Sequence, residues 1–233
     1  MSTLSLDDHY ILYVDLLGYK TIMNEMPEIE FLKIIDWSYS DVKKDLRIMS
    51  QPSHSNSLFY YKVFSDNIVV ATKADSLHAL YTLSYIAYNL QRDFLEKGIV
   101  CRGAITKGQL YINAEYVFGS GLIRAYELED NVAFYPRIIL DRLPEVNLVL
   151  ENYTDMFFYK DGDGYIIIDY LRLRNQGDVK RPFLTTHKKL VESRLNEHGP
   201  NERIYQKYTW CREYHNIVCD RLSLPDMKIC KTN

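Results

Sequence analysis

The sequence lacks the features typical of membrane proteins, of secreted disulfide-rich proteins and of nucleic-acid coats. The first eight residues are polar and include two acids, and no apolar run approaches the roughly 20 residues that cross a bilayer. The 233 residues include 4 cysteines without paired spacing, which favours a reducing compartment. A net charge of −3 is unfavourable for coating a polyanion. We therefore expect a cytoplasmic protein with no membrane span and no nucleic-acid partner.

Three familiar site motifs are also missing or incomplete. No Gly-x-Ser-x-Gly turn is present, so a hydrolase of that type is not expected. Residues 161–164, Asp-Gly-Asp-Gly, resemble a calcium loop without its terminal Glu, and Asp-Gly pairs favour hairpin turns, so we predict a turn. Cys211, His215 and Cys219 recur on one helical face, but a structural zinc site usually needs four ligands, which makes zinc the less favoured interpretation.

What is present is the pattern of one catalytic domain with a C-terminal extension. Hydrophobic residues make up 47% and charged residues 25% of the chain, enough for a sizeable core. Residue spacing predicts strands at 10–14, 58–64, 68–72, 100–106, 110–118 and 134–140, and helices at 29–49, 77–97 and 122–129. A hairpin around 161–164 and a broken helix over 188–221 follow. We predict an α+β fold with a catalytic domain at 1–150 and an extension at 151–233, packed on the core or on a partner subunit.

Two acids follow apolar runs near the start of the chain. Asp15 ends the run 10–14, and Asp66 stands in the turn between two predicted strands. Carboxylates at neighbouring strand ends suit Mg²⁺ or Mn²⁺, which complete their shells with water and substrate phosphates. Two such ions can clamp both ends of an in-line displacement at phosphorus. The alternative is that both acids simply face solvent.

Four blocks resemble, in order, the catalytic domain of the class III nucleotide cyclases, over about residues 10–141. They are Asp-Leu-Leu-Gly-Tyr at 15–19, Phe-Ser-Asp-Asn-Ile-Val-Val at 64–70, Arg-Gly-Ala-Ile-Thr-Lys-Gly at 102–108, and the glycine-led helix start and helix at 117–129. Residues 125–129 and Ser65 are most similar to the bacterial Pycsar pyrimidine cyclases. The resemblance implies a ferredoxin-like, palm-type sandwich with a mostly antiparallel sheet.

The resemblance also implies roles for the first blocks. Asp15 and Asp66 would bridge two Mn²⁺ or Mg²⁺ ions, and the Leu16 carbonyl would complete one coordination sphere. The backbone N–H groups that would face the triphosphate belong to Leu17, Gly18 and Tyr19. An ordinary strand-to-helix turn remains the alternative explanation of Gly18.

Base choice follows from departures from the purine cyclases. Lys62, four residues before Asp66, matches the adenine-reading lysine of the family, but Tyr116 stands where the family has an acid. With Arg102 as a third donor, the set suits the two carbonyls of uracil better than the amine of cytosine, so UTP is expected as substrate. The alternative is that Lys62 and Arg102 sit in solvated ion pairs.

The helix at 122–129 departs most from the family. The catalytic Asn aligns with Ile123, and the transition-state Arg aligns with Glu127. Arg124 is one position away and starts from a different helix face. Either Arg124, Lys107 or a residue of a partner subunit supplies the missing charge, or turnover is slow or lost.

Two functions from different classes therefore stay open. The first is a homodimeric pyrimidine cyclase that forms cyclic UMP and pyrophosphate, with a downstream cyclic-nucleotide effector in bacterial anti-phage defence; a cytidylate cyclase is its close variant. The second is a catalytically silent nucleotide-binding module of cyclase fold. Retention of Asp15 and Asp66 favours the first.

Overall fold

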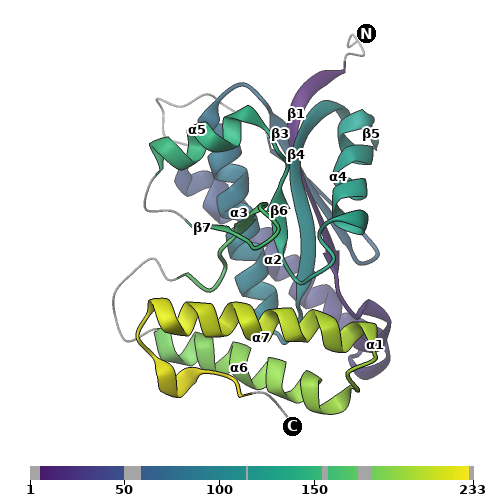
Figure 1. The fold of residues 1–233 in the computed structure, drawn as a ribbon. Helices are drawn as coiled ribbons and strands as arrows, with labels where there is room; N and C mark the ends of the chain where they lie inside the picture. Colours follow the sequence, from purple (N-terminus) through teal and green to yellow (C-terminus); the bar gives the residue numbers. More distant parts are fainter. Residues whose placement is uncertain (1–5, 50–58, 114, 154–156, 173–179, 231–233) are drawn as a thin grey trace.

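A mixed sheet organises the chain (Figure 1). The computed structural model describes residues 6–49, 59–113, 115–153, 157–172 and 180–230. Its strands are β1 (Asp7–Leu16), β2 (Phe59–Phe64), β3 (Asn67–Lys73), β4 (Cys101–Ile112), β5 (Val117–Phe118), β6 (Ile138–Leu140), β7 (Phe158–Lys160) and β8 (Ile166–Ile168). They lie in the order β2-β3-β1-β4-β6-β8-β7, with β5 paired to β4. Only the pairing of β4 with β6 is parallel among the described strands.

The first half has the predicted ferredoxin-like connectivity. The helices of the described chain are α1 (Tyr19–Glu25), α2 (Glu28–Met49), α3 (Leu77–Glu96), α4 (Ser120–Asn131), α5 (Pro144–Asn152), α6 (Lys180–Glu197) and α7 (Arg203–Arg221), with a 3₁₀ turn at Pro225–Met227. The order β1-α2-β2-β3-α3-β4, with β1 central between β3 and β4, is the βαββαβ unit of that fold. The α+β prediction is therefore confirmed.

Each face of β1 contributes to a different core. Its even-numbered residues from Tyr10 to Leu16 are buried against α2, α3 and α5. Its odd-numbered residues Ile11 and Tyr13 pack toward α4 on the opposite face. Because side chains alternate along a strand, Asp15 emerges on the α4 face, at the end of the buried run. This alternation places the acid beside α4 and away from the main core.

Three strand predictions were wrong in their limits. The segments 100–106 and 110–118 are not two equal strands, because β4 runs without a break from Cys101 to Ile112. Lys107-Gly108 resembles a turn, yet Gly108 lies inside the strand, where an added Cβ would stand 2.7 Å from Gly121 Cα in α4. The glycine therefore serves the close approach of a helix. The strand predicted at 134–140 is only three residues long, Ile138–Leu140.

The C-terminal residues continue the same sheet and add a pair of helices. The hairpin of β7 and β8 pairs with β6, so the sheet extends past residue 150. Its turn at 161–164 is confirmed, and Arg137 forms ion pairs with Asp161 and Asp163 there. Helices α6 and α7 lie side by side across the end of the sheet and share a second core with β6 and β8 (Figure 1). No helix in the described part of the chain is long and apolar enough to span a membrane.

The helical face of Cys211, His215 and Cys219 belongs to this second core. Both cysteines and the histidine are fully buried. His215 Nδ1 lies 3.0 Å from His187 Nδ1, and His215 Nε2 lies 3.0 Å from the Met227 carbonyl. Both ring nitrogens of His215 are thus engaged within the protein, which agrees with a core face rather than a zinc site.

Candidate active site

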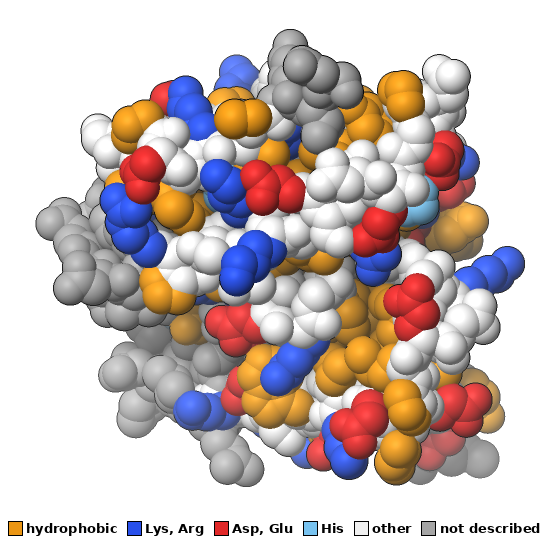
Figure 2. Space-filling view, turned by 90° about the horizontal axis from the view of Figure 1, so that it is seen from below, with side chains coloured by type: hydrophobic (Ala, Val, Ile, Leu, Met, Phe, Trp, Pro, Cys, Tyr) orange, Lys and Arg blue, Asp and Glu red, His pale blue; other side chains and the backbone are white. Residues whose placement is uncertain are grey.

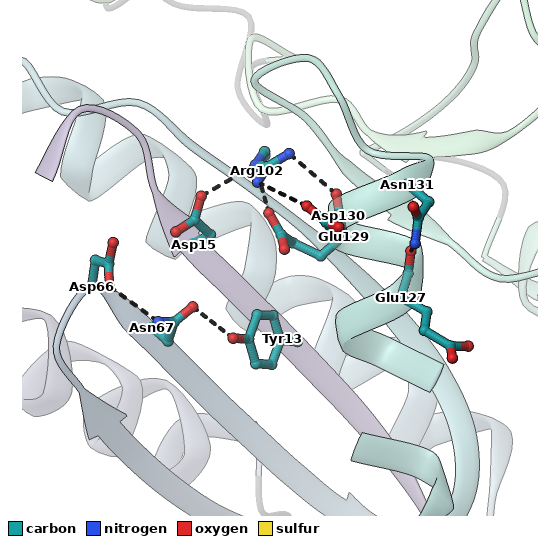
Figure 3. A network of polar contacts seen from close by, with 9 residues as sticks. All are labelled: Tyr13, Asp15, Asp66, Asn67, Arg102, Glu127, Glu129, Asp130 and Asn131. Carbon is teal, nitrogen blue, oxygen red and sulfur yellow. Dashed lines mark hydrogen bonds and ion pairs between the residues drawn. The ribbon is translucent and has the colours of Figure 1, made fainter. Parts of the chain in front are cut away.

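Asp15 and Asp66 come together where β1 ends and the β2–β3 hairpin turns (Figure 3). In the antiparallel register Asp15 stands opposite Asn67, the residue after Asp66. The Leu16 N–H donates to the Asp66 carbonyl at 2.9 Å, which ties the end of β1 to the turn. Ser65 adopts the left-handed conformation that this tight turn needs, with φ of 58°. Sheet register therefore brings two distant carboxylates to one edge.

Arg102 joins Asp15 to the end of α4. Its Nε lies 3.1 Å from Asp15 Oδ2 and 2.5 Å from Glu129 Oε1 (Figure 3). Its Nη2 lies 4.0 Å from Asp130 Oδ1. Glu129 is only 2% exposed, and its Oε1 accepts no hydrogen bond of good geometry from the described residues. Burial raises the pKa of Asp15, while Arg102 opposes that rise. One guanidinium thus faces three carboxylates, so the site has an excess of negative charge.

The donor set fits divalent cations. Asp66 Oδ1 accepts from Asn67 Nδ2 at 3.1 Å, and Asp15 Oδ2 from Arg102. The other oxygen of each carboxylate has no donor among the described residues and remains available. Hard carboxylate oxygens with room for water and phosphate are what Mg²⁺ and Mn²⁺ require. In the described chain, no group of three or more Asp, Glu, His or Cys side chains is placed to hold a metal ion.

Glu129 makes the stability of the metal-free protein depend on pH. Burial raises its pKa from 4.5 to about 7, although the charge of Arg102 opposes the rise. A raised carboxyl pKa gives stability that is complete below about pH 4.5 and is lost as pH rises through 7. Glu129→Gln keeps the neutral form and should avoid this loss. We expect the variant to gain about 2 kcal/mol over wild type between pH 5 and pH 8.

Urea unfolding in EDTA at both pH values measures this difference. Glu127→Gln is the matched control, because Glu127 is an exposed glutamate of the same helix. It should follow wild type at both pH values. Parallel stability profiles for Glu129→Gln and wild type would contradict the buried, raised-pKa carboxyl.

A cavity of about 460 Å³ is lined in part by Arg102, the ion-pair partner of Asp15. Leu17, Gly18 and Arg102 contribute to its lining, together with residues from α6 and α7. Gly18 precedes α1 with φ of 80°, a left-handed conformation that favours glycine. Tyr19 is turned away and packs against Phe31, with ring centroids 5.4 Å apart. The segment expected to face a triphosphate therefore does line a cavity, except for the Tyr19 side chain.

Other predicted site residues do not meet Asp15 within one chain. Tyr116 accepts a hydrogen bond from Asn113 beyond the far end of β4, and about ten residues of strand, or about 30 Å, separate it from Arg102. Arg124 forms a bidentate ion pair with Asp141, which also accepts from Thr106. Thr106 lies four strand residues, about 13 Å, beyond Arg102.

Lys62 lies nearer, in the middle of β2. It stands opposite Val69, which in turn stands opposite Tyr13 of β1. Lys62 is half-buried and has polar partners in the structure. Tyr13 precedes Asp15 by two residues and points to the same face of the sheet. Lys62 therefore lies on the face of Asp15, two residues along the strands from it.

Sequence reasoning missed three residues beside the acids. Glu129 had a usable signal, because it occupies a position in the buried stripe of α4, with Gly121, Ala125 and Leu128. Arg203 and Lys207 of α7 also line the cavity. They are more than 180 residues from Asp15 in the sequence, and no local pattern marks their proximity.

Comparisons with known proteins find likeness of fold alone. No protein-family model and no curated protein matches the sequence. The adenylyl cyclase CyaB from P. aeruginosa is 12% identical with a TM-score of 0.49, over 74% of this chain and 98% of that one. The Silicibacter pomeroyi adenylate/guanylate cyclase/hydrolase is 15% identical with a TM-score of 0.43, over 70% and 95%. Trypanosoma brucei adenylate cyclase is 11% identical with a TM-score of 0.47, over 73% and 92%.

Proposed function

We propose that this protein is a nucleotide cyclase that converts a pyrimidine nucleoside triphosphate, preferably UTP, into the cyclic monophosphate and pyrophosphate. The observation that carries the proposal is the juxtaposition of Asp15 and Asp66, each with an available carboxylate oxygen, beside a cavity that Arg102 and Gly18 help to line. The sequence blocks that resemble the cyclases supply the reaction type. Retention of both acids supports turnover over mere binding.

The reaction joins the ribose 3′-oxygen to the α-phosphorus. The bond between the α-phosphorus and the bridging oxygen to the β-phosphate breaks, pyrophosphate leaves, and the 3′-hydroxyl proton passes to solvent or base. Two Mn²⁺ or Mg²⁺ ions, held by Asp15, Asp66 and the Leu16 carbonyl, would supply the positive charge that acidifies the hydroxyl and stabilises the leaving group. Arg102 keeps Asp15 charged and oriented, since its Nε lies 3.1 Å from Oδ2. Leu17 and Gly18 shape the wall against which the phosphates would lie.

A second copy of the chain completes the proposed site. Tyr116 lies beyond the end of β4 that is far from Asp15, and Arg124 of α4 is paired with Asp141. Neither side chain contacts Asp15 of its own chain. Large apolar side chains are exposed on the same face, at Phe64, Tyr116, Phe118, Ile123 and Tyr126. Tyr13 links part of this group, with ring centroids 6.4 Å from Phe64 and 5.9 Å from Tyr126. Exposed large apolar side chains are typical of an interface, and two-fold pairing is the commonest closed symmetry.

UTP should be converted faster than CTP, ATP or GTP. Lys62 and Arg102 of one copy and Tyr116 of the second copy are hydrogen-bond donors, which match the O2 and O4 acceptors of uracil and leave the amine of cytosine unpaired. A buried donor left facing an amine costs roughly 1–3 kcal/mol, so we expect selectivity of about ten- to a hundredfold. Incubation with all four triphosphates and Mn²⁺, followed by mass analysis of the products, measures it.

The products also discriminate between the functions. Cyclic CMP as the main product would contradict the donor argument and preserve a pyrimidine cyclase, whereas cyclic AMP would contradict both. Lys62→Gln should reduce the preference for UTP over CTP, and Lys160→Gln, an exposed lysine on β7, is the matched control. The two lysines lie on strands at opposite edges of the sheet.

A silent nucleotide-binding module is the second candidate. Ile123 and Glu127 stand where the family has its catalytic Asn and Arg, and Arg124 is already paired with Asp141. Calorimetric binding of Mn²⁺ and nucleoside triphosphates without any cyclic product would favour this module. If the protein turns over, the resemblance to the Pycsar cyclases suggests a cytoplasmic second messenger that acts on a cyclic-nucleotide effector in anti-phage defence.

A further inference from the structure

The C-terminal helices bring cations to the cavity beside Asp15. Arg194 and His198 lie at the end of α6 and just after it, and Arg203 and Lys207 lie in the first two turns of α7. Arg102 lines the same cavity from β4. Arg102 therefore connects the cavity to Asp15, with which it forms an ion pair.

Two of these cations have no carboxylate partner among the described residues. The acids of the cavity lining are Glu25, Asp130 and Glu197; Arg194 pairs with Glu197 at 2.8 Å, and Arg102 faces Asp130. Arg203 and Lys207 both make cation–π contacts with the ring of Phe134. Arg203 Cζ lies 5.0 Å and Lys207 Nζ lies 5.7 Å from the ring centroid. One helical turn separates them, so both reach the same side of α7.

Lys207 forms no ion pair with a carboxylate among the described residues. The side chain is half-buried. Burial, and then the positive charges of Arg102 and Arg203, lower its pKa, while Asp15 and Glu129 oppose the shift. Desolvated cations are usually paired. An anion in the cavity would relieve both the desolvation and the repulsion among the three cations.

The cluster of positive charge at the cavity is confined to a small part of the face on which α6 and α7 lie. Across it, basic side chains alternate with acidic ones and form no broad positive field (Figure 2). A general attraction to polyanions is therefore not expected. A cavity of about 460 Å³ suits a small ligand.

We infer that Arg203 and Lys207 of α7 bind the β- and γ-phosphates of the nucleotide, so that the C-terminal extension forms part of the substrate site within the same chain. This inference rests on the proposed function. It gives the extension a role beyond packing. It also adds positive charge from α7 to a site in which Glu127 stands at the family's arginine position. Leu17 and Gly18 line the same cavity.

The test measures binding of inorganic tripolyphosphate in the presence of Mg²⁺ by isothermal titration, with turnover of UTP measured separately. The variant is the double substitution Arg203→Gln and Lys207→Gln. Charge-assisted hydrogen bonds are worth about tenfold or more each, so we expect tripolyphosphate to bind about 30- to 100-fold more weakly. KM for the triphosphate should rise by a similar factor, while binding of the nucleoside is unchanged.

The double substitution Lys160→Gln and Lys189→Gln removes the same charge from two exposed sites and should bind like wild type. Far-ultraviolet circular dichroism and the melting temperature show whether both variants fold. The single substitution Lys207→Arg keeps the positive charge and should bind tripolyphosphate like wild type. Wild-type affinity for tripolyphosphate in the Arg203 and Lys207 variant would overturn the inference, even if UTP is cyclised normally. Equal losses in both double variants would overturn it as well, because they would indicate a general charge effect.

The proposed function fails separately. If wild type makes no cyclic product but loses tripolyphosphate binding on substitution of Arg203 and Lys207, the cavity is a polyphosphate site in a silent module. That result supports the inference and rejects the cyclase.

Discussion

Asp15→Asn is expected to lower the rate of cyclic nucleotide formation at least about a thousandfold. The amide keeps the size of the side chain but removes the charge that holds a divalent ion, and the lost transition-state stabilisation amounts to several kcal/mol. Asp66→Asn should have the same effect, because its carboxylate serves the same ions from the neighbouring turn. Product formation from UTP with Mn²⁺ is the measurement.

The matched control is Asp8→Asn, an exposed aspartate on the same strand. It should retain the wild-type rate. Asp15 faces Arg102 in the folded protein, so a melting curve of each variant separates loss of chemistry from loss of structure. A folded Asp15→Asn protein with near-wild-type turnover would contradict the assignment of Asp15 as a metal ligand.

Ile123→Asp is expected to convert a homodimer into an inactive monomer. The side chain is 61% exposed on α4, among the apolar residues of the proposed interface. A charge in the centre of an interface costs about 2–4 kcal/mol, so the dissociation constant should rise about 30- to 1,000-fold. Light scattering at micromolar concentration gives the mass, and UTP turnover gives the activity.

Ile29→Asp is the control for Ile123→Asp. Ile29 is 58% exposed in the first turn of α2, where an acid is favourable for the helix. It should stay dimeric and active. A wild-type protein that is monomeric while still making product would contradict the shared site.

Mixing two inactive variants sharpens the same test. Asp15→Asn and Arg124→Ala damage opposite halves of a shared site. In a mixed dimer one of the two sites would receive both intact residues, so a one-to-one mixture should regain about one quarter of wild-type activity. A mixture that stays inactive, although both proteins form dimers, would mean that Arg124 acts within its own chain.

Local sequence patterns were sufficient where one residue type decides the structure. The nearly continuous apolar run at residues 10–14 predicted a buried strand that is followed by an acid, and the turn chemistry around Asp66 predicted the hairpin. The apolar spacing of 77–97 predicted α3, with Gly98 following in a left-handed conformation. The gap predicted between the strands 100–106 and 110–118 was wrong, because a glycine needed for close helix packing resembles one needed for a turn.

The sequence by itself determined most of the elements, the βαββαβ order and the two acids, because these depend on side-chain period and on neighbours within a few residues. Only the tertiary structure decided which charges share a site. Sheet register brought Asp15 to Asp66 and Arg102, a buried stripe brought Glu129 to them, and the packing of α7 brought Arg203 and Lys207 to the adjoining cavity. Such proximity depends on contacts between distant segments, because burial and charge at a site are properties of the whole fold rather than of any stretch of chain.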